Sequence, residues 1–240
     1  MLNRKCPVCL KNELSYFDDY VECAYCHTYK RKLNFFEKQF NWAKNKSSWW
    51  RIVILGLFII MLIQNWKDTW FSVNQAYNPL VLFDFGIHEL GHPIFSLFGT
   101  LMYIAGGCLF QCLFPILWIV AFYRIRWFFA SAMCWGWLGI NIFSVATYAN
   151  DARSRLLPLG GWGALNSDGS DASYDQGHDW YQLLSRTHHL EWDHIISHIL
   201  RISGSIVFIF GLVLGLLIII YSIGSHFMKK YKKLNVGMKA

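Results

Sequence analysis

Hydrophobic residues gather in long, nearly uncharged runs along this chain. Each run is rich in Leu, Ile, Phe and Trp, and each approaches or exceeds the length of a helix that crosses a bilayer, which takes about 20 residues. The runs lie at residues 50–65, 79–98, 100–123, 127–148 and 199–222. The pattern predicts an all-α polytopic membrane protein with roughly four to six transmembrane helices.

Composition supports a membrane protein. Hydrophobic residues make up 55% of the 240 residues and aromatic residues 18%, whereas charged residues make up only 15%. Soluble domains carry about 25% charged residues, so an ordinary soluble or disordered chain is excluded. The net charge is +7. In so apolar a chain we expect this charge to set orientation in the membrane, and we expect no nucleic-acid partner.

Positive charge is concentrated towards the two ends of the chain. Residues 1–51 hold ten basic and five acidic residues, and residues 195–240 hold six basic and no acidic residues. Cytoplasmic segments of membrane proteins are rich in Lys and Arg, so we expect both termini in the cytoplasm, which requires an even number of crossings. The run at 79–98 would then be re-entrant or partly buried, with the acidic loop 149–194 outside. Five full crossings are the alternative.

Four cysteines near the N-terminus have the spacing of a metal site. Cys6, Cys9, Cys23 and Cys26 form two CxxC pairs separated by 13 residues. Two such pairs can close a tetrahedral zinc site with four thiolate ligands, which we favour over disulfides because cytoplasmic cysteines stay reduced. The segment is too small for a hydrophobic core, so bound zinc would supply its folding free energy. It resembles a zinc ribbon over residues 4–30, and its saturated site indicates a structural zinc.

The segments divide the chain into four parts. These are a zinc ribbon at 1–30, a basic juxtamembrane linker at 31–49, a transmembrane domain at 50–222 and a basic tail at 223–240. The linker can contact anionic membrane lipid or serve only to set orientation. The ribbon can dock a cytosolic protein partner. Because its first CxxC pair lies where the apolar stretch of a secretory signal would be, we expect no such signal.

The second apolar run contains the sequence His88-Glu89-Leu-Gly-His92. Residues four apart lie on one face of a helix, so the two histidines can bind one metal ion, and Glu89 can take a proton from metal-bound water. An ionised carboxylate at mid-membrane costs on the order of 2.5–3.5 kcal/mol, so such residues indicate a function or a buried pairing. The alternative is that both histidines only form hydrogen bonds inside a helix bundle.

This motif resembles the membrane-embedded zinc metallopeptidases of the site-2 protease type, over about residues 84–95. The resemblance implies hydrolysis of membrane or membrane-proximal peptide bonds, with His88 and His92 as ligands of a catalytic zinc and Glu89 as general base. In that family a later acidic residue, in a Leu-Asp-Gly segment of a membrane helix, completes the site. This chain departs from that pattern, because its nearest counterpart is Asn-Ser-Asp168-Gly in a polar loop.

A catalytic zinc takes three protein ligands and a water, so one more ligand is expected from the acidic loop 149–194. The candidates are Asp151, Asp168, Asp171, Asp175, His178 and Asp179. We favour His178, whose imidazole the adjacent Asp179 could orient. Asp151 is the second choice and Asp168 the third. A surface loop histidine is the alternative for His178.

Two carboxylates near the site have competing interpretations. Asp179 and Gln182 have the spacing of a capping box that would open a helix at 180–184. Asp84 lies four residues before His88, on the same helix face, and we place it in the second shell as a partner that orients this imidazole. The alternative for Asp84 is a favourable charge at the helix N-terminus.

Together these features predict a membrane-embedded zinc protease with one catalytic and one structural Zn²⁺, acting on a membrane or membrane-proximal protein. A non-catalytic zinc-binding membrane adaptor or sensor is the alternative. A membrane di-iron desaturase or hydroxylase is a weaker one, because no His-x-x-His-His box is present. The histidine pairs such an enzyme would use are His88 and His92, His188 and His189, and His194 and His198.

Overall fold

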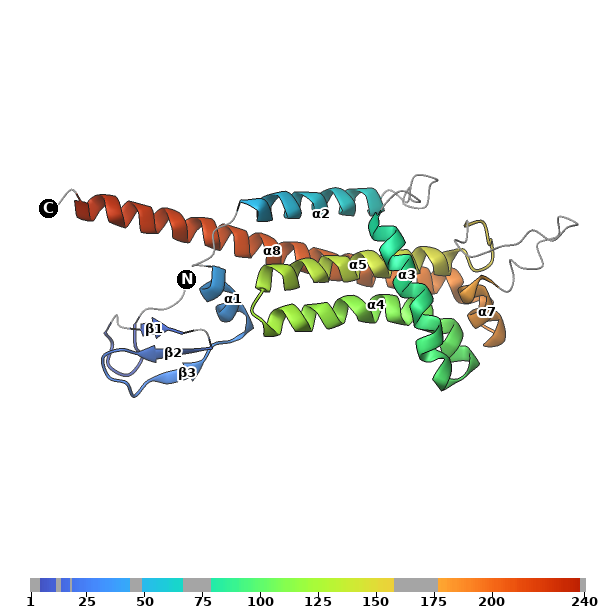
Figure 1. Cartoon of the computed structure of the whole chain (residues 1–240), viewed down its shortest axis with the longest axis horizontal. Coiled ribbons are helices and arrows are strands. Elements are labelled where there is room, and N and C mark those ends of the chain that lie inside the picture. Colours follow the sequence, from blue (N-terminus) through green and yellow to red (C-terminus); the bar gives the residue numbers. More distant parts are fainter. Residues whose placement is uncertain are drawn as a thin grey trace, which may run out of the picture.

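A computed structural model describes residues 5–11, 14–17, 19–43, 49–66, 79–157 and 177–237. Over these residues the chain is mostly helical, with a small antiparallel sheet near the N-terminus (Figure 1). The helices are α1 (Phe35–Ala43), α2 (Trp50–Trp66), α3 (Pro79–Phe95), α4 (Thr100–Arg124), α5 (Phe128–Asn150), α7 (Asp179–Arg186) and α8 (Asp193–Gly237), with 3-10 turns η3 (Ser96–Phe98) and η4 (Leu190–Trp192). The predicted helical class is therefore confirmed.

Three helices are long and apolar enough to cross a membrane. They are α4, α5 and the segment Leu190–Ser225, which consists of η4 and the first part of α8. Helix α2 is apolar over Trp50–Ile60 but shorter. Helix α3 runs across α4 and α5 rather than alongside them (Figure 1). Among the described residues, three helices are therefore long enough to cross a membrane. The predicted total of four to six crossings stays a prediction.

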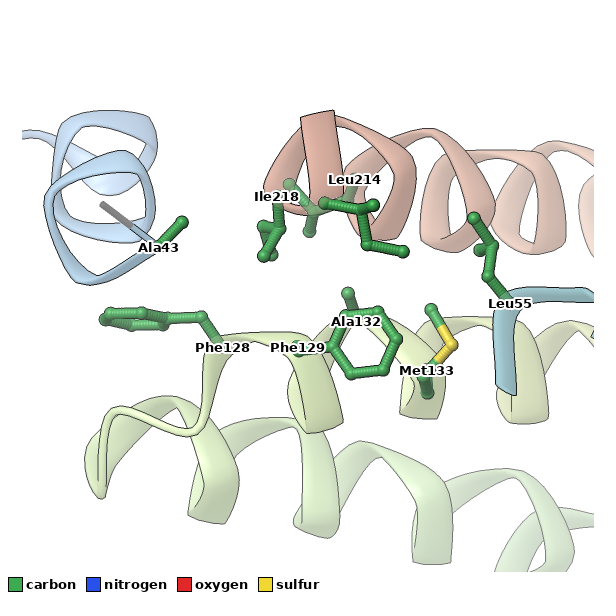
Figure 2. Close-up of a cluster of buried hydrophobic side chains, with 9 residues drawn as sticks. Ala43, Leu55, Phe128, Phe129, Ala132, Met133, Leu214 and Ile218 are labelled. Atoms are coloured by element: carbon green, nitrogen blue, oxygen red, sulfur yellow. The ribbon is translucent and has the colours of Figure 1, made fainter. Parts of the chain in front are cut away.

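Helix α5 lies at the centre of the bundle and packs most extensively against α8. Glycines make this contact close: a Cβ on Gly139 would lie 2.6 Å from the Cβ of Phe208, and one on Gly211 would lie 2.6 Å from the backbone nitrogen of Gly136. Membrane helices associate through such small residues, because lipid supplies no hydrophobic drive for helix pairing. The buried cluster in Figure 2 comes from α1, α2, α5 and α8. It includes Ala43, Leu55, Phe128, Phe129, Ala132, Met133, Leu214 and Ile218.

The N-terminal unit is a three-stranded sheet of β1 (Leu14–Tyr16), β2 (Tyr20–Cys23) and β3 (Lys30–Lys32), in that order. It is fastened to the turn between α4 and α5. Asp19 forms ion pairs with Lys38 Nζ, at 2.9 Å, and with Arg126. The hydrogen bond from Lys38 lowers the pKa of the Asp19 carboxyl, which favours the charged form of the pair.

The opposite end of the bundle is closed by α7 and by the start of α8 (Figure 1). Arg153, just after α5, pairs with Asp193 at the first residue of α8, with 2.8 Å between Nε and Oδ2. His194 Nδ1 lies 2.8 Å from Oδ1 of Asn150, the last residue of α5. These contacts hold the start of α8 against the end of α5.

Candidate metal centres

The four N-terminal cysteines lie together around one point and form the four-cysteine cluster. Their sulfur atoms are all within 4.8 Å of one another, with 3.7 Å between Cys6 and Cys26 and 3.6 Å between Cys9 and Cys23. Zinc–sulfur bonds of about 2.3 Å set the sulfurs of a tetrahedral site about 3.8 Å apart, so the cluster has the dimensions of a metal site.

A second cluster contains both histidines of the HExxH motif. His88 and His92 are 9% and 7% exposed and turn from α3 towards Asp179, at the start of α7. Oδ2 of Asp179 lies 3.0 Å from Nε2 of His88 and 3.4 Å from Nε2 of His92. One ligand atom from each of the three residues falls within 4.8 Å of the others. Ligand bonds of about 2.0–2.2 Å give separations of this size around a single metal ion.

The other ring nitrogen of each histidine is held by α4. Nδ1 of His92 donates to the carbonyl oxygen of Tyr103 at 2.8 Å, and Nδ1 of His88 donates to Oε1 of Gln111 at 3.2 Å. A proton on Nδ1 leaves the lone pair of Nε2 available, which is the tautomer that a metal ligand needs. The structure therefore places both Nε2 atoms on the same side, facing Oδ2 of Asp179.

Gly107 of α4 leaves the space in front of these two nitrogens open. A Cβ at this position would lie 2.5 Å from Nε2 of His88 and 2.7 Å from Nε2 of His92. Any side chain here would occupy the volume next to the ligand atoms. The neighbouring Gly106 meets Gly91 of α3, where a Cβ on either would overlap the other backbone. The close crossing of α3 and α4 thus depends on glycine.

Asp179 is positioned by a network at the end of α5. Its backbone N–H donates to the hydroxyl of Tyr148 at 2.9 Å. The Tyr148 ring packs on the ring of His178, with centroids 4.5 Å apart. His178 is fully buried, and its Nε2 lies 3.3 Å from Oδ2 of Asp151. Asp151 also accepts hydrogen bonds from Ser154 and from the backbone N–H groups of Leu156 and Leu157.

We call Asp151, Tyr148 and His178 the clasp. It joins the last turn of α5 and the residue that follows α5 to the N-cap of α7, on either side of a segment outside the described residues. Because Asp179 directly follows His178, the clasp determines where that carboxylate lies. The hydroxyl of Tyr148 accepts the hydrogen bond from the Asp179 backbone and so ties this residue directly to α5.

The structure changes several assignments made from the sequence. The carboxylate of Asp179, rather than the imidazole of His178, lies against the two histidines, because His178 turns towards Asp151. The predicted capping box with Asp179 as N-cap is wrong: His178 is the N-cap of α7, and its Nδ1 accepts from the backbone N–H of Tyr181 at 3.2 Å. Asp168, the third choice, lies outside the described residues.

Asp84 also differs from the expectation that it orients His88. Its Oδ1 accepts a hydrogen bond from Nε1 of Trp137 at 2.8 Å, whereas Gln111 is the partner of His88. Gln111 was missed as a site residue, although a polar side chain in an apolar run was a signal for it. Glu89 follows His88 on α3, and its side chain is exposed next to the cluster.

Each of the two clusters can hold one metal ion. Among the residues that the structure describes, the histidine pairs expected of a di-iron enzyme do not converge, since only His88 and His92 belong to a metal-binding group. Comparison of the chain with models of protein families, with curated proteins and with solved structures gives no match. The chemistry of both centres follows from their donor sets and surroundings.

Proposed function

We propose that this chain is a membrane-embedded zinc peptidase whose catalytic ion is bound by His88, His92 and Asp179. The observation that supports this most is the approach of one carboxylate oxygen to both Nε2 atoms, at 3.0 and 3.4 Å. Two imidazoles and one carboxylate are a ligand set of catalytic zinc, which keeps the fourth position for water. Asp179 has the part of the later acidic residue in the site-2 protease type, which the motif resembles.

Glu89 is the proposed general base. When bound, zinc would lower the pKa of its water and polarise the peptide carbonyl. Glu89 neighbours a ligand and is exposed, so it can reach both that water and an incoming peptide. It would accept a proton from the water and later donate it to the leaving amine. Gln111 and the carbonyl of Tyr103 would hold the two imidazoles in the ligating tautomer throughout.

The four-cysteine cluster is the proposed site of the second zinc. Four thiolates saturate a tetrahedral ion, so this zinc would stabilise the N-terminal unit and leave no position for substrate. The unit lies at the end of the bundle where α8 also ends (Figure 1). This arrangement supports a multi-pass protein with both termini in the cytoplasm, where the ribbon would meet a cytosolic protein partner and the basic segments would contact anionic lipid.

The test is proteolysis by purified protein in detergent, with labelled casein as the unfolded probe. Wild type should cleave it, and Glu89→Gln should slow cleavage at least about 100-fold, because general acid–base catalysis contributes 10²–10⁴. Zinc content should be unchanged by this substitution. Glu191→Gln, the same change at another exposed glutamate, is the control and should keep wild-type activity.

Two results would contradict the peptidase. Equal cleavage by wild type and Glu89→Gln would assign the activity to a contaminant. Absence of cleavage in a preparation that holds both zinc ions would favour the non-catalytic adaptor or sensor, with the second zinc as a structural ion.

A further inference from the structure

The two candidate metal centres lie at opposite ends of the helix bundle. Helix α4 shows this most directly. Its last turn contacts α1, which follows the N-terminal unit: the ring of Tyr123 stacks on that of Phe35 with centroids 5.2 Å apart. Tyr103 and Gly107, which contact the HExxH histidines, belong to its first two turns. Figure 1 shows the same separation, with the strands at one end and α7 at the other.

The helix geometry gives the distance between the two ends. With a rise of about 1.5 Å per residue, Gly107 lies about 25 Å from Arg124 along α4, and Tyr148 lies about 30 Å from Phe128 along α5. The hydrocarbon core of a bilayer is about 30 Å thick. Across a membrane spanned by these helices, the HExxH centre therefore lies in the leaflet opposite the four-cysteine cluster. By the same rise it is about 10 Å from the start of α4.

Charge distinguishes the two faces of the membrane. Three arginines lie at the end of the bundle that carries the four-cysteine cluster: Arg51 stacks on Trp42 of α1, Arg124 is the last residue of α4, and Arg126 pairs with Asp19. The last turns of α8, which contain Lys229, Lys230, Lys232 and Lys233, extend towards the same end (Figure 1). The segment 149–194, which begins in the last turn of α5 and contains α7, holds seven acidic and three basic residues in the sequence. Basic segments remain in the cytoplasm, and thiols that bind zinc are kept reduced there.

We infer that the HExxH centre opens towards the extracytoplasmic face and acts on membrane-anchored proteins whose scissile bond lies in the juxtamembrane segment on that face. The substrate part rests on the proposed peptidase function, whereas the placement of the centre does not. Glu89 lies on the exposed face of α3 beside Leu90 and Ile94, which are 52% and 40% exposed. A carboxylate flanked by exposed apolar side chains suits a substrate that approaches within the bilayer and itself carries apolar side chains.

The substrate must also be locally extended. A peptide bond inside a helix has its carbonyl engaged in the helix hydrogen bonds, and no water replaces them in the hydrocarbon core. A bond about 10 Å from the start of α4 lies near the headgroups, where a membrane helix can unwind at a small cost. The inferred class is therefore a single membrane anchor followed by a flexible extracytoplasmic segment.

Placement is tested by cysteine labelling of the full chain in right-side-out membrane vesicles. Leu156→Cys follows α5 at the HExxH end, and Ile125→Cys lies in the α4–α5 turn; the parent side chains are 82% and 57% exposed. A membrane-impermeant maleimide should label Leu156→Cys in sealed vesicles and Ile125→Cys only after permeabilisation. Wild type reports the background of native cysteines. The reverse pattern, or labelling of both variants in sealed vesicles, would overturn the placement.

Substrate class is tested by co-reconstitution with two single-pass proteins. Both carry the same flexible segment, one on the extracytoplasmic and one on the cytoplasmic flank of the anchor. Wild type should cut only the extracytoplasmic segment, and Glu89→Gln should cut neither. Cleavage on the cytoplasmic flank would overturn the inference. Cleavage on neither flank, with the labelling as expected, would contradict the proposed function and the substrate class but leave the placement standing.

Discussion

Each imidazole of the HExxH centre turns one nitrogen towards the proposed zinc position and is oriented through the other. For His88 the orienting partner is Gln111, at 3.2 Å from Nδ1. Replacing Gln111 by Leu removes this acceptor and should weaken zinc binding at the centre by about 10–100-fold, the usual effect of losing an outer-shell partner. Zinc titration against a competing chelator would measure the loss.

Asp84→Asn is the matched control for this prediction. Asp84 and Gln111 are both buried polar residues near α3, but Asp84 accepts its hydrogen bond from Trp137. Its amide should leave zinc affinity within about threefold of wild type, since it keeps the shape and loses only a charge remote from the Nε2 atoms. A larger loss in Asp84→Asn than in Gln111→Leu would show that Asp84 orients His88 after all.

Gly107 gives a steric test of the same centre. Its substitution by Ala would place a methyl group 2.5 and 2.7 Å from the two Nε2 atoms and should remove the zinc from this site. Gly86→Ala, on α3, meets nothing within 4 Å and should retain it. Zinc per protein distinguishes the two variants. Retention of the second ion in Gly107→Ala would contradict the location that we assign to it.

The sequence was informative about residues that share one helix and less so about residues that meet across the fold. His88, Glu89 and His92 follow from spacing alone, as do the paired cysteines. Asp179 lies 91 positions from His88, so its approach depends on the path of the chain between α5 and α7. His178 takes the N-cap position of α7, and this leaves Asp179 to face the histidines. The sequence pattern does not show which of these two adjacent residues faces them.

At the scale of elements, the clasp connects α5 to α7 and holds the carboxylate ligand in place. Asp151 accepts hydrogen bonds from several donors of the following turn and from His178. Asp151→Asn replaces one accepting oxygen by a donor, so some of these bonds must be lost. We expect about a tenfold loss of zinc affinity at the HExxH centre, with the zinc of the four-cysteine cluster retained.

Chelator competition with Asp19→Asn alongside checks this prediction. Asp19 is the acidic residue that pairs with Lys38 and Arg126 at the other end, so its amide variant should not alter the HExxH centre. If the Asp151 and Asp19 variants have the same zinc affinity as wild type, then α7 is positioned without the clasp.

The boundaries of the long helices were predicted well, but the crossing of α3 over α4 was not predicted. The run at 100–123 corresponds to α4 and the run at 127–148 to α5, because apolar residues identify membrane-length helices from composition. Helix α8 begins before its predicted run, since polar residues such as His194 and His198 are included in the helix. The crossing of α3 over α4 depends on the pairing of Gly91 with Gly106, which hydropathy does not detect.

For the whole molecule, the structure separates the four-cysteine cluster, near one end of the bundle, from the HExxH centre near the opposite end. The first is built by cysteines close in sequence and needs no helix of the bundle for its ligands. The second is complete only when α3, α4 and α7 are assembled. The two ions should therefore respond differently to unfolding: the HExxH zinc should be released when the bundle loosens, whereas the zinc of the four-cysteine cluster should remain bound.

The central claim is that Asp179 completes a second zinc site with the HExxH histidines. It is tested most directly by zinc per protein in detergent for wild type, Asp179→Asn and Asp168→Asn, the last being the alternative from the sequence. We expect two zinc ions per protein in wild type, one in Asp179→Asn and two in Asp168→Asn. Two ions in Asp179→Asn, or loss of one in Asp168→Asn, would contradict it.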